Sequence, residues 1–71
     1  MKKLVKESLN EAVEQNGIKW DIDFENLLDN DLDEHMEIYN ADGLDKHGRQ
    51  YQGAAYFFDE RFEEIKDIGE V

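Results

Sequence analysis

The chain has 71 residues, of which 19 are acidic and 8 are basic, and its formal net charge at pH 7 is −11. We expect a chain of this length to form one small domain over residues 1–71, and its negative charge argues against direct binding to nucleic acid or to an anionic membrane and favours cationic partners. The sequence contains no cysteine, which excludes disulfides and thiolate metal sites and is typical of a cytoplasmic protein.

The first expected element is an amphipathic helix over residues 3–16. Val5, Leu9 and Val13 recur at the spacing of one helical face, while most of the charged residues lie elsewhere. Gly17 would end this helix in a left-handed conformation. The basic residues that precede the helix are not followed by the uninterrupted apolar run of a signal peptide or a membrane span. The predicted role of the helix is to cover one face of a sheet.

A strand is predicted next, over residues 18–24, because the hydrophobic period changes from that of a helix to two. The apolar side of this strand carries Ile18, Trp20, Ile22 and Phe24, and the polar side carries Lys19, Asp21 and Asp23. Trp20 offers the largest single burial in the chain. We expect its indole near the margin of the sheet, where its N–H can reach a hydrogen-bond partner.

Residues 25–35 are predicted to form an acidic connection whose leucines cap one end of the core. The alternating oxygen side chains of residues 29–33 resemble the opening of a calcium-binding loop. However, Glu34 stands where the sharp turn of such a loop requires glycine, and Asn40 stands where a bidentate glutamate completes the coordination. We therefore expect a solvated loop without a bound metal or other cofactor.

The centre of the fold is predicted to be a hairpin over residues 36–58, closed by a three-residue loop in which Gly48 is left-handed. Asp45 and Arg49 would then face each other. This register places Tyr39, Ala41, Tyr51, Gly53, Ala55 and Phe57 on one face, and Met36, Ile38, Ala54, Tyr56 and Phe58 on the other. Small residues on the first face leave room for a helix, so we place the core there. Gly43 leaves one alternative open, since a bulge at this glycine would exchange the faces of the residues before it.

The C-terminal residues 59–69 allow two interpretations. The spacing of Phe58, Phe62 and Ile65 suits a short helix, whereas a turn at residues 59–61 followed by a charged strand suits the edge of the sheet. Both interpretations give an α+β fold class: an N-terminal amphipathic helix packed on a small antiparallel sheet of three to four strands with a central hairpin.

Catalytic chemistry finds little support in the sequence. Ser8 is the only serine, threonine and cysteine are absent, and no nucleophile elbow surrounds Ser8. His35 and His47 have no partner at the spacing of metal ligands on a helix. The sequence therefore predicts a protein that is not an enzyme.

The distribution of charge points instead to a binding surface. From Trp20 to Asp45 there are ten acidic residues and no lysine or arginine. If the first strand stays extended, Asp21, Asp23 and Glu25 form an outward row with about 6.6 Å between neighbours, a pattern that small nucleic-acid mimics also use to occupy basic grooves. Acidic faces also serve simply to keep small proteins soluble. The predicted partner-binding residues are Asp21, Asp23, Glu25, Asp29, Asp31, Asp33, Glu34 and Glu37.

Two functions follow from these observations. The leading hypothesis is a small acidic binding protein, monomeric or weakly dimeric, that occludes a cationic surface of a partner protein, with a nucleic-acid-binding surface as one candidate. The alternative is a structural or oligomerisation module that uses the second apolar face of the hairpin, formed by Met36, Ile38, Tyr56 and Phe58.

Overall fold

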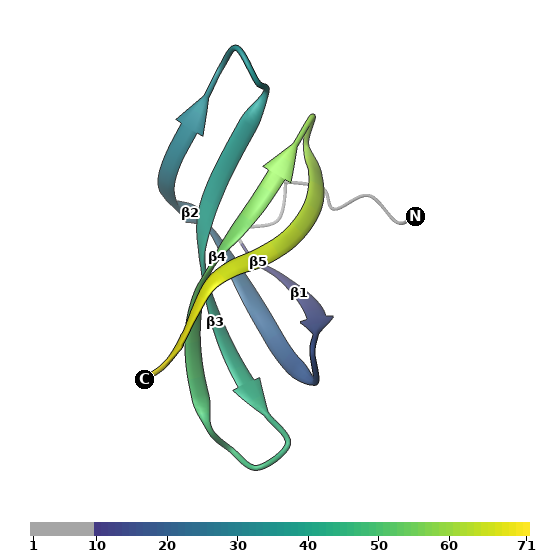
Figure 1. Ribbon diagram of the computed structural model, residues 1–71, viewed down its shortest axis with the longest axis vertical. Helices are drawn as coiled ribbons and strands as arrows, with labels where there is room; N and C mark the ends of the chain where they lie inside the picture. Colours follow the sequence, from purple (N-terminus) through teal and green to yellow (C-terminus); the bar gives the residue numbers. More distant parts are fainter. Residues whose placement is uncertain (1–9) are drawn as a thin grey trace.

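A computed structural model describes residues 10–71, which form a single five-stranded antiparallel sheet without a helix (Figure 1). The strands are β1 (Asn10–Gln15), β2 (Ile18–Asp31), β3 (Met36–Asp45), β4 (Gln50–Phe58) and β5 (Arg61–Glu70). Each strand pairs with its neighbours in sequence, so the strand order is β1-β2-β3-β4-β5. The predicted α+β class, with three to four strands under a helix, is therefore wrong. Among the described residues there is no helix long and apolar enough to cross a membrane.

The expected N-terminal helix is not seen. Its described part, residues 10–16, belongs to β1 and to the turn that follows, and residues 3–9 lie outside the described part of the chain. Asn16 and Gly17 both have positive φ angles, 55° and 77°, and form a two-residue connection in which Gln15 pairs with Ile18. An Asn-Gly pair is the preferred type I′ hairpin turn, because its twist matches that of the strands. The glycine that predicted a helix end is thus one half of a hairpin turn.

The central hairpin agrees with the prediction in turn, register and core face. Gly48 has a φ of 82°, and its N–H donates to the carbonyl of Asp45 at 3.1 Å, while the Asp45 N–H donates to the carbonyl of Arg49 at 3.1 Å. The pairing of β3 with β4 then runs without a shift from Leu44 opposite Gln50 to Met36 opposite Phe58. The bulge considered at Gly43 is therefore absent from this pairing.

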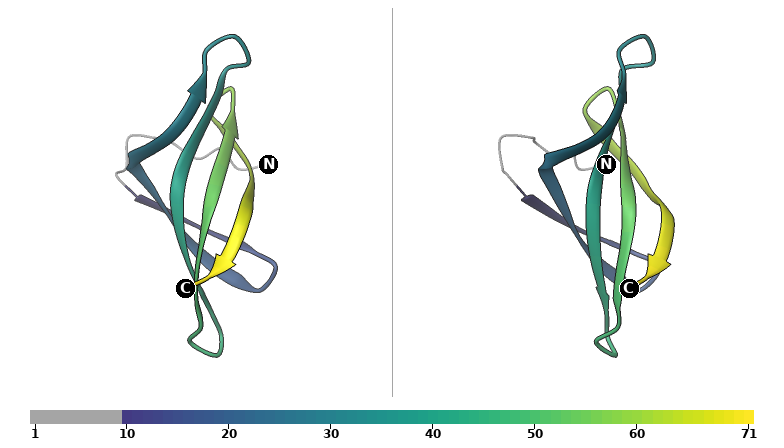
Figure 2. Two further views of the ribbon diagram at one scale, coloured as in Figure 1. Left: turned by 60° about the vertical axis from the view of Figure 1, so that its left-hand side comes forward. Right: turned by 90° about the vertical axis from the view of Figure 1, so that its left-hand side faces the viewer.

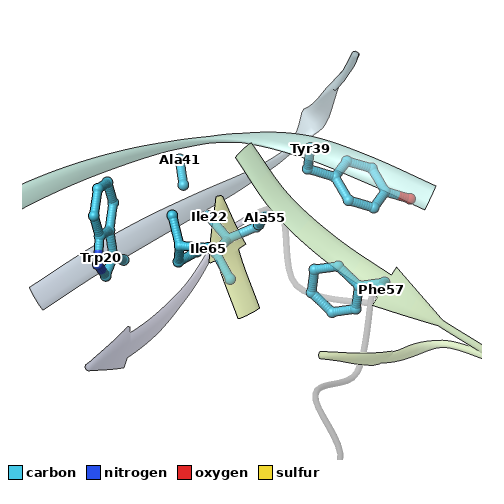
Figure 3. Close-up of a cluster of buried hydrophobic side chains, with 7 residues drawn as sticks. All are labelled: Trp20, Ile22, Tyr39, Ala41, Ala55, Phe57 and Ile65. Atoms are coloured by element: carbon cyan, nitrogen blue, oxygen red, sulfur yellow. The ribbon is translucent and has the colours of Figure 1, made fainter. Parts of the chain in front are cut away.

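The sheet curls, as the two views of Figure 2 show, and its concave side encloses the core. The buried core residues on this side are Trp20, Ile22, Tyr39, Ala41, Ala55, Phe57 and Ile65 (Figure 3). Their strands place them together, because alternate residues of β2, β3 and β4 point inward. The predicted core face of the hairpin is confirmed, but the element that covers it is the curled sheet itself and not a helix.

Trp20 occupies the space that the small residues of the hairpin leave free. An ideal Cβ atom on Gly43 would lie 2.8 Å from two ring carbons of Trp20, and one on Gly53 would lie 3.3 Å from a third. The indole therefore lies against backbone that only glycine can provide. Trp20 is 1% exposed, and its Nε1 has no hydrogen-bond acceptor among residues 10–71. The expectation of a partnered indole at the sheet margin is thus wrong.

Aromatic rings fill the other part of the core. Phe24 meets the rings of Tyr39 and Phe57 edge to face, with centroid separations of 5.1 Å and 5.5 Å. Phe62 completes the cluster from β5, at 5.7 Å from Phe57. These edge-to-face contacts add to the stabilisation from burial, and they connect β2 to β5 across the concave side.

Strand β2 is longer than predicted. The strand expected over residues 18–24 is confirmed, but β2 continues to Asp31 through most of the predicted connection. Its register against β3 shifts between Asp23 and Leu27 and again between Leu27 and Asp29, as in β-bulges that bend a strand. Beyond this bend, residues 27–31 of β2 pair with residues 36–39 of β3, which also pair with β4; we call this end of the β2–β3 hairpin, with its turn, the arm (Figure 1). The leucines of the arm do not cap the core, because Leu27, Leu28 and Leu32 are exposed.

The C-terminal segment is an edge strand, so the helical interpretation is wrong. Asp59 and Glu60 have φ angles of 51° and 63° and form a two-residue turn between β4 and β5. Strand β5 then pairs antiparallel with β4 and directs Ile65 into the core. Its remaining side chains are mostly exposed, as expected of a charged edge.

Candidate interaction surface

Seven carboxylates lie at one end of a molecule that measures 39 Å along its longest axis. Here the turn at residues 32–35 lies beside the turn at Asp59 and Glu60, because the Asp59 N–H donates to the carbonyl of His35 at 2.9 Å. Both turns are near the top of Figure 1. We call this region the acidic end, and its carboxylates belong to Asp29, Asp31, Asp33, Glu34, Glu37, Asp59 and Glu60.

An open cleft of about 380 Å³ lies between the two turns of the acidic end. Its lining combines carboxylates, one imidazole and two apolar side chains: Asp31, Leu32, His35, Met36, Glu37, Asp59 and Glu60. Carboxylates attract cations, and the apolar side chains favour a partner group that also has an apolar part. The cleft therefore suits the side chain of a lysine or an arginine. The methylene stem of such a side chain would contact the apolar lining, and its charged head would contact the carboxylates.

Leu32 gives the acidic end an apolar projection. It is 81% exposed at the start of the turn between β2 and β3, directly between Asp31 and Asp33 in the chain. Leu28 and Leu27, 52% and 48% exposed, lie further down the same arm. An apolar side chain with charged residues around it matches the general layout of a protein interface, an apolar centre within a polar rim.

Two carboxylates of the arm hold its backbone in shape. Asp31 Oδ1 accepts the N–H of Asp33 at 3.0 Å and the N–H of Glu34 at 3.3 Å, and Asp29 Oδ1 accepts the N–H of Asn30 at 2.8 Å. The oxygens that resemble calcium ligands in the sequence thus serve local backbone groups. Within residues 10–71, no three His, Asp or Glu side chains are grouped so that they could hold a metal ion.

The outward row predicted on the first strand is interrupted. Asp21 is exposed and lies opposite Asp42 on the convex side of the sheet. Asp23 is half-buried, and its Oδ1 accepts the N–H of Glu25 at 3.0 Å where the pairing of β2 with β3 shifts. The carboxylates of Asp21, Asp23 and Glu25 therefore do not continue an evenly spaced row.

The eight predicted residues consequently fall into two groups. Asp21 and Asp23 lie on the convex side of β2, with Glu25 at the bend that follows. The other five, Asp29, Asp31, Asp33, Glu34 and Glu37, lie together in the arm. Sequence reasoning missed Asp59, Glu60 and the exposed Leu32 as members of this second group. The possible turn at residues 59–61 was the only signal for the first two.

The opposite end of the molecule has a mixed charge. Lys46 and Arg49 flank the turn between β3 and β4, near the acidic Asp45 and Glu70. Asp45 is a structural carboxylate: its Oδ1 accepts the N–H groups of His47 at 2.8 Å and Arg49 at 2.9 Å, and its Oδ2 accepts the Tyr51 hydroxyl at 2.9 Å. The opposite end therefore carries less net negative charge than the acidic end.

The pKa of Asp45 reflects these contacts. Partial desolvation acts to raise the pKa of this carboxyl, but the hydrogen bonds from Arg49, Tyr51 and His47 together lower it below its ordinary value. The bond to the Asp45 carboxylate in turn raises the pKa of the Tyr51 hydroxyl. Asp45 is thus bound within its own turn and does not extend the acidic end.

The apolar face suggested for oligomerisation lies on the convex side, but it is partly covered within the chain. Ile38 is 8% exposed, and the ring of Tyr56 carries the Nζ atom of Lys66 at 4.8 Å from its centroid. Met36 and Phe58 are half-buried. This face offers less free apolar surface than the sequence alone indicates.

Comparisons with known proteins found no family model, no curated protein and no solved structure that matches this chain.

Proposed function

We propose that the chain is a small acidic binding protein, without catalytic activity, that occludes a cationic surface of a partner protein through its acidic end. The observation that supports this proposal is the position of Leu32, 81% exposed beside a cleft lined by carboxylates. In a complex, Leu32 would enter an apolar pocket of the partner. The carboxylates around it would pair with lysine and arginine side chains at the rim of the interface.

The concentration of charge supports the same mode of action. Carboxylates grouped at one end of the molecule attract a basic surface over a distance of about one Debye length, roughly 8 Å at physiological salt. This attraction raises the rate of encounter and orients the arm toward the partner. Where the basic surface normally binds nucleic acid, occlusion by the acidic end would compete with that binding. We propose that this occurs in the cytoplasm, which the absence of cysteine suits.

The charge of the acidic end can be tested with a triple amide variant, Asp33→Asn, Glu34→Gln and Asp59→Asn. All three side chains are exposed, and asparagine tolerates the positive φ of 51° at residue 59. The matched control removes the same formal charge elsewhere, through Glu14→Gln, Asp67→Asn and Glu70→Gln. The probe is a soluble peptide of mixed lysine and leucine composition. Its affinity for each variant is measured by isothermal titration at two salt concentrations.

The acidic-end variant is expected to bind this probe more weakly than the control variant and with a flatter dependence on salt. If the probe instead binds diffusely to the whole acidic protein, the two variants lose affinity to the same extent. Equal affinities and equal salt dependence in the two variants would refute the proposal. A third variant, Asp21→Asn, Asp23→Asn and Glu25→Gln, reports whether the convex side of β2 contributes.

Oligomerisation is the alternative use of this chain. The burial of Ile38 and the position of Lys66 over Tyr56 leave less of the convex apolar face free for a second copy. Light scattering distinguishes the two functions. A monomer at low and high salt agrees with the binding protein, whereas a dimer that persists at high salt would favour the oligomerisation module.

A further inference from the structure

The side chain of Gln15 joins the two edge strands of the sheet, β1 and β5. Gln15, at the end of β1, accepts the N–H of Ile65 through its Oε1 at 2.8 Å and donates from its Nε2 to the carbonyl of Ile65 at 3.0 Å. Gln15 and Ile65 are separated by 50 residues in the chain. The side-chain amide thus makes the same pair of bonds to Ile65 that a residue of a neighbouring antiparallel strand would make.

This contact matters because β1 and β5 are not neighbours in the sheet, whose order ends at these two strands. An exposed strand edge presents backbone groups that remain open to other chains. At Ile65 the Gln15 amide occupies that position. The sheet is thereby closed at one point, in the region where it curls around the core.

The contact also lies over a buried part of the core. Ile65 is 2% exposed, and its Cγ2 atom would lie 2.7 Å from an ideal Cβ on Gly53. The ring of Trp20 lies beside the same glycine, and Figure 3 shows Ile65 near Trp20 and Ile22. Separation of β5 from Gln15 would therefore open the layer that covers these residues.

We propose that the boundary between β1 and β5, which we call the seam, opens locally, and that the two hydrogen bonds between Gln15 and Ile65 keep it closed. When these bonds break, β5 separates from β1 and Trp20 becomes exposed, while the pairing of β2, β3 and β4 stays intact. This device is independent of the proposed function at the acidic end, which lies on other elements. Within residues 10–71, two hydrogen bonds from the Gln15 side chain join β1 to β5, whereas each neighbouring pair of strands is held by a ladder of backbone bonds.

The test compares amide hydrogen exchange by NMR in the wild-type chain, in Gln15→Met and in Gln50→Met. Methionine preserves the length of the side chain and removes both bonds to Ile65. Gln50 is an exposed glutamine on β4, so the same substitution there is a matched control. Each net hydrogen bond changes a local opening equilibrium by about fivefold. Exchange at Ile65 should therefore accelerate by roughly ten- to thirtyfold in Gln15→Met, with little change at Ala41.

A second measurement follows Trp20, the only tryptophan in the chain. Acrylamide should quench the fluorescence of Trp20 more strongly in Gln15→Met than in Gln50→Met. The variant Gln15→Glu, which keeps the acceptor for the Ile65 N–H but loses the donor, should lie between the wild type and Gln15→Met in both measurements. Unchanged protection of Ile65 in Gln15→Met would overturn the proposal. Equal acceleration at all amides, or loss of the fold in both Gln15 variants, would also overturn it, because either result shows that the seam does not open locally.

Discussion

Substitution of Gly43 by alanine separates two physical effects of opposite sign. Glycine in the interior of a strand is ordinarily less stable than alanine by about 0.5–1 kcal/mol, because glycine loses more backbone entropy on folding. From its position in a strand alone, Gly43→Ala would therefore stabilise the protein. The structure predicts a loss of stability, since the new Cβ would lie 2.6 Å from Ile18 Cγ2 and 2.8 Å from two ring carbons of Trp20.

The size of the loss follows from these contacts. The Trp20 ring is rigid and 1% exposed, so a shift away from a new Cβ would disturb the buried residues around it. Excess volume in a packed core costs typically about 1–3 kcal/mol, which exceeds the entropic gain. A net loss of about 1–2 kcal/mol is expected, and for a domain of this size that corresponds to a fall in Tm of roughly 5–15 °C.

Urea denaturation, followed by far-ultraviolet circular dichroism, measures the change in the free energy of unfolding. Gly69→Ala is the matched control, because an ideal Cβ there meets no atom within 4 Å. Gly53→Ala should be destabilising like Gly43→Ala, since its Cβ would lie 2.7 Å from Ile65 Cγ2. In a Trp20→Leu background, Gly43→Ala should cost less than in the wild type. Two results would refute the described packing of Trp20. One is a Gly43→Ala variant as stable as Gly69→Ala, and the other is an equal loss of unfolding free energy from Gly43→Ala in the wild type and in the Trp20→Leu background.

Three further predictions concern the core, the β3–β4 turn and the net charge. Trp20→Ala should reduce the free energy of unfolding by about 3–5 kcal/mol, whereas Lys46→Ala in the exposed turn should stay within about 0.5 kcal/mol; equal losses on urea denaturation would mean that the core lies elsewhere. Because the folded pKa of Asp45 is lowered, its ionised form stabilises the protein above the unfolded pKa of about 3.9, and this contribution is lost as the pH falls through the folded pKa. The Tm difference between the wild type and Asp45→Asn should thus be largest at neutral pH and shrink in acid, and a difference independent of pH would contradict this. Moderate sodium chloride should raise the Tm by screening repulsion within a chain of net charge −11, and an unchanged or lower Tm would count against it.

The sequence predicted the parts of the fold whose signals are local and physically specific. Gly48, in a three-residue loop, fixed the register of the central hairpin, and that register determined which alternate residues of β3 and β4 face the core. The strand at residues 18–24 followed in the same way from its strict alternation. In these segments turn chemistry and hydrophobic period agree, and the bulge left open at Gly43 is absent from the pairing of β3 with β4.

The N-terminal segment shows why local signals can fail. A short apolar pattern suits one face of a helix as well as alternate positions of a strand, and Gly17 can end a helix as well as complete a hairpin turn. The preceding Asn16 is the feature that favours the hairpin, since both residues of a type I′ turn need a positive φ. The Asn-Gly pair is therefore the local signal that favours a strand over a helix in residues 10–15.

The candidate site was only partly predictable, because it depends on contacts between distant segments. The acidic residues of the arm were evident from composition. Their proximity to Asp59 and Glu60 depends on the hydrogen bond between Asp59 and His35, which no local pattern indicates. The exposure of Leu32 was also not predictable from the sequence, since a leucine in an acidic connection is more readily interpreted as part of a core.

The most direct test of the proposed binding surface uses a basic partner protein isolated from a lysate on the immobilised wild-type chain, and measures the affinity of that protein for Leu32→Ser. This substitution preserves every charge, and because Leu32 is 81% exposed, the stability of the free protein should not change. Burial of a leucine side chain in an interface is worth about 1.5–3 kcal/mol, so the Kd measured by isothermal titration should rise by roughly tenfold or more. An unchanged Kd for Leu32→Ser, with the partner still bound as tightly as by the wild type, would contradict the account.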